Sequence, residues 1–179
     1  MGKLVIALRT LPTGVLNEGL LELLTNCLER FADRILKGGA VHRFSLRWRD
    51  TAADQRQLLA LLRTVVQQHR NTRRRSQLTA AERRSAISAL LVLNEVLNAI
   101  DAKEPTARAV LWRCRSGLGD LTTRLQADQL ERQALASRHL GDVEQARRCY
   151  RHARELLATR PQIARPHELD ALAGQLAAA

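Results

Sequence analysis

Apolar residues recur every three or four positions along most of this chain, and this period restricts the possible folds more than any other feature. In residues 15–37 the repeating positions are Leu16, Leu20, Leu24, Cys27, Phe31 and Ile35. Such spacing places apolar side chains on one face of an α-helix. Hydrophobic residues make up 45% of the chain but aromatic residues only 3%, so the core must consist of aliphatic side chains, as is typical of helix bundles. We therefore expect an all-α, multi-helix bundle of six or seven helices.

Start and stop signals divide the chain into elements. The expected helices cover about residues 15–37, 51–68, 80–100, 105–117, 120–139, 143–158 and 167–176. Thr79 and Glu82 have the spacing of a capping box, in which each side chain bonds the other residue's backbone N–H. Gly117 and Gly119 weaken the helical pattern and predict a kink or a short break between them. We expect a helical core domain in residues 1–119, and a hairpin with a short last helix in residues 120–179 that packs on this core as one unit.

One segment departs from the helical period. Residues 41–49 alternate polar and apolar side chains, with Phe44, Leu46 and Trp48 on one face and arginines on the other. Alternation with period two is typical of extended backbone. Because a strand without a partner is not stable alone, the pattern predicts an extended connector or a short strand.

The clearest local motif lies near the C-terminal end of the sequence. A Gly141-Asp142 turn is followed by Ala146, Tyr150 and Ala153, at the fifth, ninth and twelfth positions after the glycine. Residues 127–161 thereby resemble one tetratricopeptide repeat, a helical hairpin in which small residues allow close approach of the helices and an aromatic residue fills the gap. The resemblance implies a peptide-binding groove. The alternative is an ordinary helical hairpin with the same packing.

The hairpin also carries the first candidate binding residues. Arg147, Arg151 and Arg154 share a face of the helix expected at 143–158, because they are separated by four and three positions. Together with Tyr150 they form a candidate partner-binding surface. The alternative for the arginines is the solvated side of an amphipathic helix.

Positive charge is concentrated in one quarter of the chain. The whole sequence has a net charge of +11, and residues 42–84 alone contain eleven basic and three acidic residues. The candidate polyanion-binding residues in this segment are Arg43, Arg47, Arg49, Arg70, Arg73, Arg74, Arg75, Arg83 and Arg84, with Trp48 as a candidate for stacking on a base. Guanidinium groups bind phosphates, and phosphate contacts dominate non-specific nucleic-acid affinity. Acidic proteins, membrane headgroups and a simply solvated loop are the alternatives for the same arginines, and Trp48 in the core is the alternative to stacking.

Catalytic and metal-binding signatures are missing from the sequence. The five histidines are scattered, and the three cysteines, Cys27, Cys114 and Cys149, form no Cys-x-x-Cys pair, which favours buried thiols in a reducing, cytoplasmic compartment. No cofactor and no membrane span are expected, and the oligomeric state stays open. The function predicted is a non-enzymatic adaptor or regulatory module that binds a protein partner. The alternatives are a nucleic-acid-binding protein acting through residues 42–84, and a chaperone or accessory subunit of a larger bacterial assembly.

Overall fold

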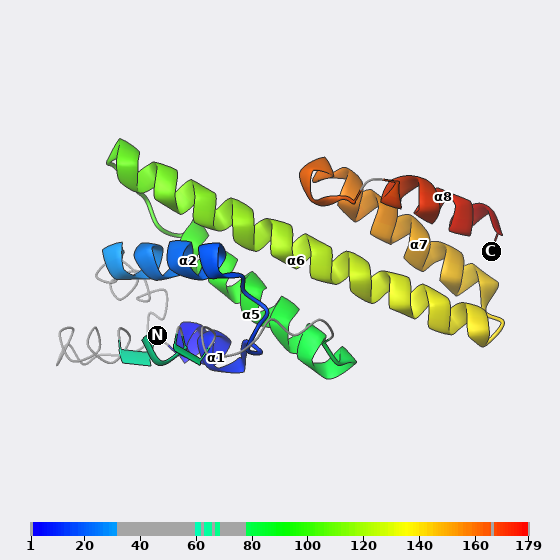
Figure 1. The fold of residues 1–179 in the computed structure, drawn as a ribbon, viewed down its shortest axis with the longest axis horizontal. Helices are drawn as coiled ribbons and strands as arrows, with labels where there is room; N and C mark the ends of the chain where they lie inside the picture. The colour runs from blue at the N-terminus through cyan, green and yellow to red at the C-terminus, as the bar shows by residue number, and fades with distance from the viewer. Residues whose placement is uncertain are drawn as a thin grey trace. The chain divides into compact units, whose positions relative to one another are not determined.

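The computed structural model describes residues 2–31, 60–61, 63–65, 67–68, 78–165 and 167–178. The elements bounded there are α1 (Gly2–Thr10), α2 (Glu18–Arg30), α5 (Ala80–Asn98), α6 (Pro105–His139), α7 (Val143–Ala158), the short 3-10 helix η2 (Pro161–Ile163) and α8 (Glu168–Ala178) (Figure 1). These described ranges contain helices and turns but no strand, which confirms the all-α fold. The alternating segment 41–49 lies outside the described residues.

Local signals set several helix ends where the sequence predicts them. The capping box at the start of α5 is present: Glu82 N donates to Thr79 Oγ1 at 3.2 Å, and Thr79 N donates to a Glu82 carboxylate oxygen at 2.9 Å. α7 covers the expected residues 143–158. α2 begins later than predicted, because Asn17 caps it by accepting a hydrogen bond from Leu20 N at 2.8 Å.

The break expected at Gly117 and Gly119 is wrong, because α6 runs unbroken through both glycines. Each glycine instead admits a close neighbour. A Cβ atom at residue 117 would lie 2.8 Å from Leu20 Cδ1, and one at residue 119 would lie 2.6 Å from Arg160 Nη2. A glycine inside a helix costs about 1 kcal/mol relative to alanine, which a helix held by tertiary packing tolerates.

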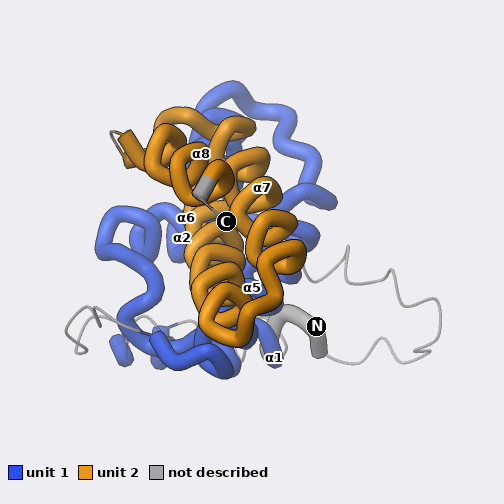
Figure 2. The backbone as a smooth tube through the Cα atoms, turned by 90° about the vertical axis from the view of Figure 1, so that its right-hand side faces the viewer, with its two compact units in different colours: residues 1–118 blue, residues 119–179 orange. Residues whose placement is uncertain are grey.

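The chain divides into two compact units, residues 1–118 and 119–179 (Figure 2), where the sequence led us to expect 1–119 and 120–179. In the first unit α1 packs against α5. Arg115 on α6 completes the C-terminal end of α5 by donating hydrogen bonds to Leu97 O at 3.1 Å and Ile100 O at 2.9 Å. Cys27 and Cys114 are fully buried in this unit, as expected of structural thiols.

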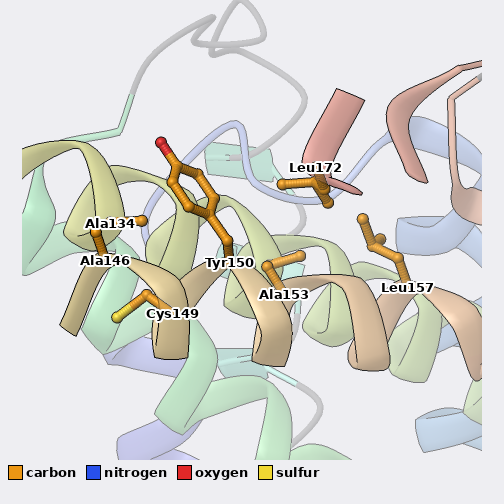
Figure 3. Packing of buried hydrophobic residues seen from close by; sticks show 8 residues of the cluster. Ala134, Ala146, Cys149, Tyr150, Ala153, Leu157 and Leu172 are labelled. Carbon is orange, nitrogen blue, oxygen red and sulfur yellow. The ribbon is translucent and has the colours of Figure 1, made fainter. Parts of the chain in front are cut away.

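The second unit has its own core between the second half of α6, α7 and α8. Its buried members are Ala127, Ala134, Ala146, Cys149, Tyr150, Ala153, Leu157 and Leu172. Figure 3 shows Tyr150 among the small side chains of α6 and α7 and Leu172 of α8. Small residues let the helices approach, and the Tyr150 ring fills the remaining space, which is the packing expected for the hairpin from the sequence.

Candidate functional site

The turn between α6 and α7 holds the hairpin in a defined geometry. Gly141 has a φ of +79°, its N–H donates to Arg138 O at 3.1 Å, and Asp142 N donates to Ser137 O at 2.9 Å. These two bonds form a Schellman motif, which requires a left-handed residue that glycine adopts without strain. The Asp142 side chain then caps α7 by accepting a hydrogen bond from Gln145 N at 3.0 Å. One helix therefore ends and the next begins within three residues.

Burial on one side of α7 leaves its arginines on the surface. The buried positions of α7 are Ala146, Cys149, Tyr150, Ala153 and Leu157, which recur at helical spacing. Arg151 and Arg154 are exposed, and Arg147 is half-buried with 42% of its side chain accessible. We call Arg147, Arg151 and Arg154 the arginine face, because their spacing places them on one flank of α7.

Carboxylates near the arginine face are few. Residues 132–155 contain six arginines and three acidic residues, Asp142, Glu144 and the exposed Glu155. Asp142 accepts the capping hydrogen bond, and Glu144 lies 3.5 Å from Arg147 in an exposed i, i+3 pair. Such pairs contribute about 0.2–1 kcal/mol and are screened by salt. In the part of the chain that the structure describes, no other ion pair involves the arginine face.

Four further carboxylates of this unit, Asp120, Asp128, Glu131 and Glu168, lie around other arginines. Arg124 on α6 pairs with Asp128 at 3.1 Å and with Glu168 of α8 at 2.6 Å. Burial raises the pKa of the Glu131 carboxyl, and the negative charges of Asp128 and Glu168 raise it further. Arg160, which follows α7, pairs with Asp120 at 2.5 Å. Acidic groups are thus used to join α6 to α8 and to the segment after α7, away from the arginine face.

Tyr150 does not belong to the surface on which the sequence placed it. Its side chain is fully buried, so the ring packs the hairpin core and is not available to a partner. The hydroxyl oxygen is also buried and has no hydrogen-bond partner among the described residues. This is a correction to the candidate partner-binding residues, because only the three arginines remain accessible.

Arg83 is not available as the polyanion-binding residue that the sequence predicted. It is only 5% exposed, and its Nη2 donates to Leu78 O at 3.1 Å. The guanidinium therefore folds back onto the chain before α5 and is withdrawn from the surface. Arg84 beside it is exposed. The remaining candidates, Arg43, Arg47, Trp48, Arg49, Arg70, Arg73, Arg74 and Arg75, lie outside the described residues.

Exposed aliphatic side chains at the hairpin end were not anticipated from the sequence. Leu135 is 45% exposed, Leu140 86% and Val143 39%. Leu140 precedes the left-handed Gly141 and so stands in the turn, where neither helix covers it. The residue order His139-Leu140-Gly141 could have indicated this exposure. The residue before a glycine that ends a helix lies at the end of that helix, where the next turn of the helix no longer covers its side chain.

Over the described ranges no group of three or more His, Cys, Asp or Glu side chains has an arrangement that could hold a metal ion. None of the helices described there has both the length and the apolarity needed to cross a bilayer.

The fold and this surface define an all-α protein whose C-terminal unit is a helical hairpin with a basic flank, closed by α8. The chain matches no protein-family model, no curated protein and no solved structure.

Proposed function

We propose that this chain is a non-enzymatic adaptor that binds an acidic protein segment through the arginine face of α7. The observation that carries the proposal is the separation of charge within the second unit. Carboxylates cluster around Arg124 and Arg160, whereas the arginine face pairs within the described residues only with the exposed Glu144. Guanidinium groups in this setting are available for two-pronged hydrogen bonds to a partner's carboxylates.

The rigid support of the arginine face favours this use. α7 is fixed at its start by the Asp142 cap and along its length by a fully buried row that includes Tyr150 and Leu157. A surface held on a packed helix loses little conformational freedom when a partner binds. The resemblance of residues 127–161 to a tetratricopeptide repeat supports the same class of function, because such hairpins present peptide-binding surfaces.

The test is a binding measurement with a matched charge control. A fluorescently labelled glutamate-rich peptide is titrated with the wild-type protein, with R147Q/R151Q/R154Q and with R9Q/R63Q/R113Q. The control removes three exposed arginines elsewhere, so both variants have the same net charge. We expect the arginine-face variant to lose about tenfold to a hundredfold in affinity, from three contacts of about 0.5–1 kcal/mol each. The control should lose much less, and equal losses in both variants would contradict the proposal.

Nucleic-acid binding is the second candidate, and it is favoured by the charge of residues 42–84, which hold eleven basic and three acidic residues. The exposed Arg84 would contribute at the start of α5. Binding to labelled single- and double-stranded DNA should then weaken steeply with salt, and R73A/R74A/R75A should flatten that dependence. An absence of binding at low salt would exclude this candidate.

A further inference from the structure

The hairpin end places aliphatic side chains beside the arginine face, and this combination specifies the partner further. We infer that the partner segment is an acidic amphipathic helix, whose carboxylates meet the arginine face while its apolar side contacts Leu140 and Val143. This inference rests on the proposed function and adds the apolar contact to it.

Three exposed aliphatic side chains lie within nine residues. Leu135 is on the last turns of α6, Leu140 is in the turn, and Val143 is the first residue of α7, with exposed fractions of 45%, 86% and 39%. Single exposed leucines are common on protein surfaces, but apolar residues gathered in one place and bordered by charge mark interaction sites. The Schellman motif and the Asp142 cap hold this turn in place, so Leu140 and Val143 are presented in one backbone conformation.

Helical spacing aligns part of the cluster with the arginine face. Val143 precedes Arg147 by four residues, Arg151 by eight and Arg154 by eleven, and positions so related share one flank of a helix. This flank of α7 is therefore apolar at its N-terminal end and has arginines along the rest of its length, with the exposed Glu144 and Glu155 beside them. Leu140 extends the apolar end into the turn.

Charge complementarity selects the occupant. Residues 132–154 have six arginines against two acidic residues, so a basic or neutral helix is disfavoured. Successive residues of the arginine face are separated by three or four positions, which is about 4.5–6 Å along the helix axis. Carboxylates repeated at the same interval on a second helix meet them in register, and an aliphatic residue one turn further along reaches Val143 and Leu140. Amphipathic helices are recognised elsewhere by such regularly spaced anchors.

The experiment uses three synthetic probes with the full-length chain. The first is a helical peptide with glutamates at i, i+4 and i+7 and leucines at one end of the same face. The second has the same composition in scrambled order, and the third is the glutamate-rich peptide without leucine. L140S and V143S remove the apolar contact, and L91S is the matched control, since Leu91 is 49% exposed on α5. Circular dichroism and thermal unfolding establish that each variant is folded.

We expect L140S to weaken binding of the amphipathic peptide by about fivefold to tenfold, because part of an aliphatic side chain loses its cover. V143S should weaken it less, and L91S should bind as the wild type does. The glutamate-rich peptide should bind L140S and the wild type equally, because it makes no apolar contact.

Three kinds of result would overturn the inference without affecting the proposed function. The first is equal affinity of the wild type for the scrambled and amphipathic peptides. The second is an affinity of L140S for the amphipathic peptide equal to that of the wild type, with the arginine-face variant still impaired. The third is a stronger dependence on Leu140 for binding to anionic phospholipid vesicles or DNA than for binding to the amphipathic peptide. If R147Q/R151Q/R154Q binds all peptides as its charge-matched control does, the proposed function itself fails.

Discussion

At the scale of single residues, the largest departures concern polar groups that the fold draws inside. The sequence suggested two roles for Tyr150, in the packing of the hairpin and on its binding surface, and it placed Arg83 on the surface, whereas the structure buries both side chains. Arg83 donates a hydrogen bond to Leu78 O, whereas the Tyr150 hydroxyl has no partner among the described residues. A buried polar group costs free energy unless it is hydrogen-bonded. The two residues therefore differ in what their substitution does.

Replacing Tyr150 by phenylalanine is expected to raise the free energy of unfolding by about 1 kcal/mol, because the buried hydroxyl is removed while the ring is kept. Replacing it by alanine is expected to lower that free energy by about 3–5 kcal/mol, because a cavity is left. Urea denaturation of both variants measures the difference. Destabilisation by Y150F would show that the hydroxyl has a bonding partner in solution.

Arg115 provides the opposite case of a polar side chain with well-placed partners. Its guanidinium donates to Leu97 O and Ile100 O at the end of α5, a helix with no basic residue in its own last turn. We expect R115Q to lower the free energy of unfolding by about 1.5–3 kcal/mol, the range for hydrogen bonds from charged groups. R113Q changes an exposed neighbour and should stay within about 0.5 kcal/mol of the wild type. Equal effects in chemical denaturation would contradict this role of Arg115.

At the scale of secondary-structure elements, glycine has different roles at different positions. Gly117 and Gly119 lie inside α6 and admit Leu20 and Arg160. Gly141 ends α6 with a φ of +79°. Gly174 lies inside α8, and a Cβ atom there would meet nothing within 4 Å. The same residue type therefore provides space inside α6 and a left-handed backbone conformation at its C-terminal end.

Alanine substitution separates these roles. A Cβ atom at Gly141 would also meet nothing within 4 Å, so G141A tests the left-handed conformation alone and should destabilise the protein by about 1–2 kcal/mol. G174A should stabilise it by about 0.4–1 kcal/mol, because alanine favours the helix and restricts the unfolded chain. Thermal unfolding of the two variants should move the midpoint in opposite directions. An unchanged or raised midpoint in G141A would contradict the Schellman geometry, and a lowered midpoint in G174A would contradict the helical role of residue 174.

At the scale of the whole molecule, charge is sorted by position. Residues 120–131 contain one arginine and three acidic residues, whereas residues 132–154 contain six arginines and two acidic residues. Arg124, the one arginine of residues 120–131, joins α6 to α8 by its ion pair with Glu168. Residues 132–154 contain the proposed partner-binding surface. Stability and binding therefore depend on different groups and should respond differently to pH.

The pH dependence of stability is expected to change in E131Q. Burial and two neighbouring carboxylates raise the pKa of Glu131 in the folded state, so the folded protein holds this proton more tightly than the unfolded chain. The contribution of Glu131 to the stability of the wild-type protein is therefore lost as the pH rises from the pKa of a glutamate in the unfolded chain, about 4.3, to its higher pKa in the folded protein. E131Q should be more stable than the wild type above that window and gain nothing below it. Urea denaturation at pH 3 and pH 7 measures this, and an equal difference at both values would contradict it.

Glu168 should act with the opposite sign. Although burial opposes it, hydrogen bonds from Arg124 and from the Arg165 backbone N–H lower its pKa. The stabilisation from Glu168 is complete above its unfolded pKa and is lost as pH falls through the folded pKa. E168Q should therefore destabilise the protein at pH 7 and have little effect once the carboxylate of the wild type is protonated.

The sequence by itself determined the features that depend on neighbours a few residues apart. The helical period predicted the all-α class, Thr79 and Glu82 predicted the start of α5, and Gly141-Asp142 predicted the turn before α7. In each case the bonding groups lie within one or two helical turns of each other, so their geometry follows from the order of residues.

Only the tertiary structure decided which residues meet from distant parts of the chain. Leu20 lies against Gly117 and Arg160 against Gly119, so two apparent helix breakers stand inside a continuous α6. The burial of Arg83 and the exposure of Leu140 also depend on how the chain packs around them, and helical spacing does not specify which neighbour covers a given flank. The arginine face was therefore visible in the sequence, but its apolar end was not.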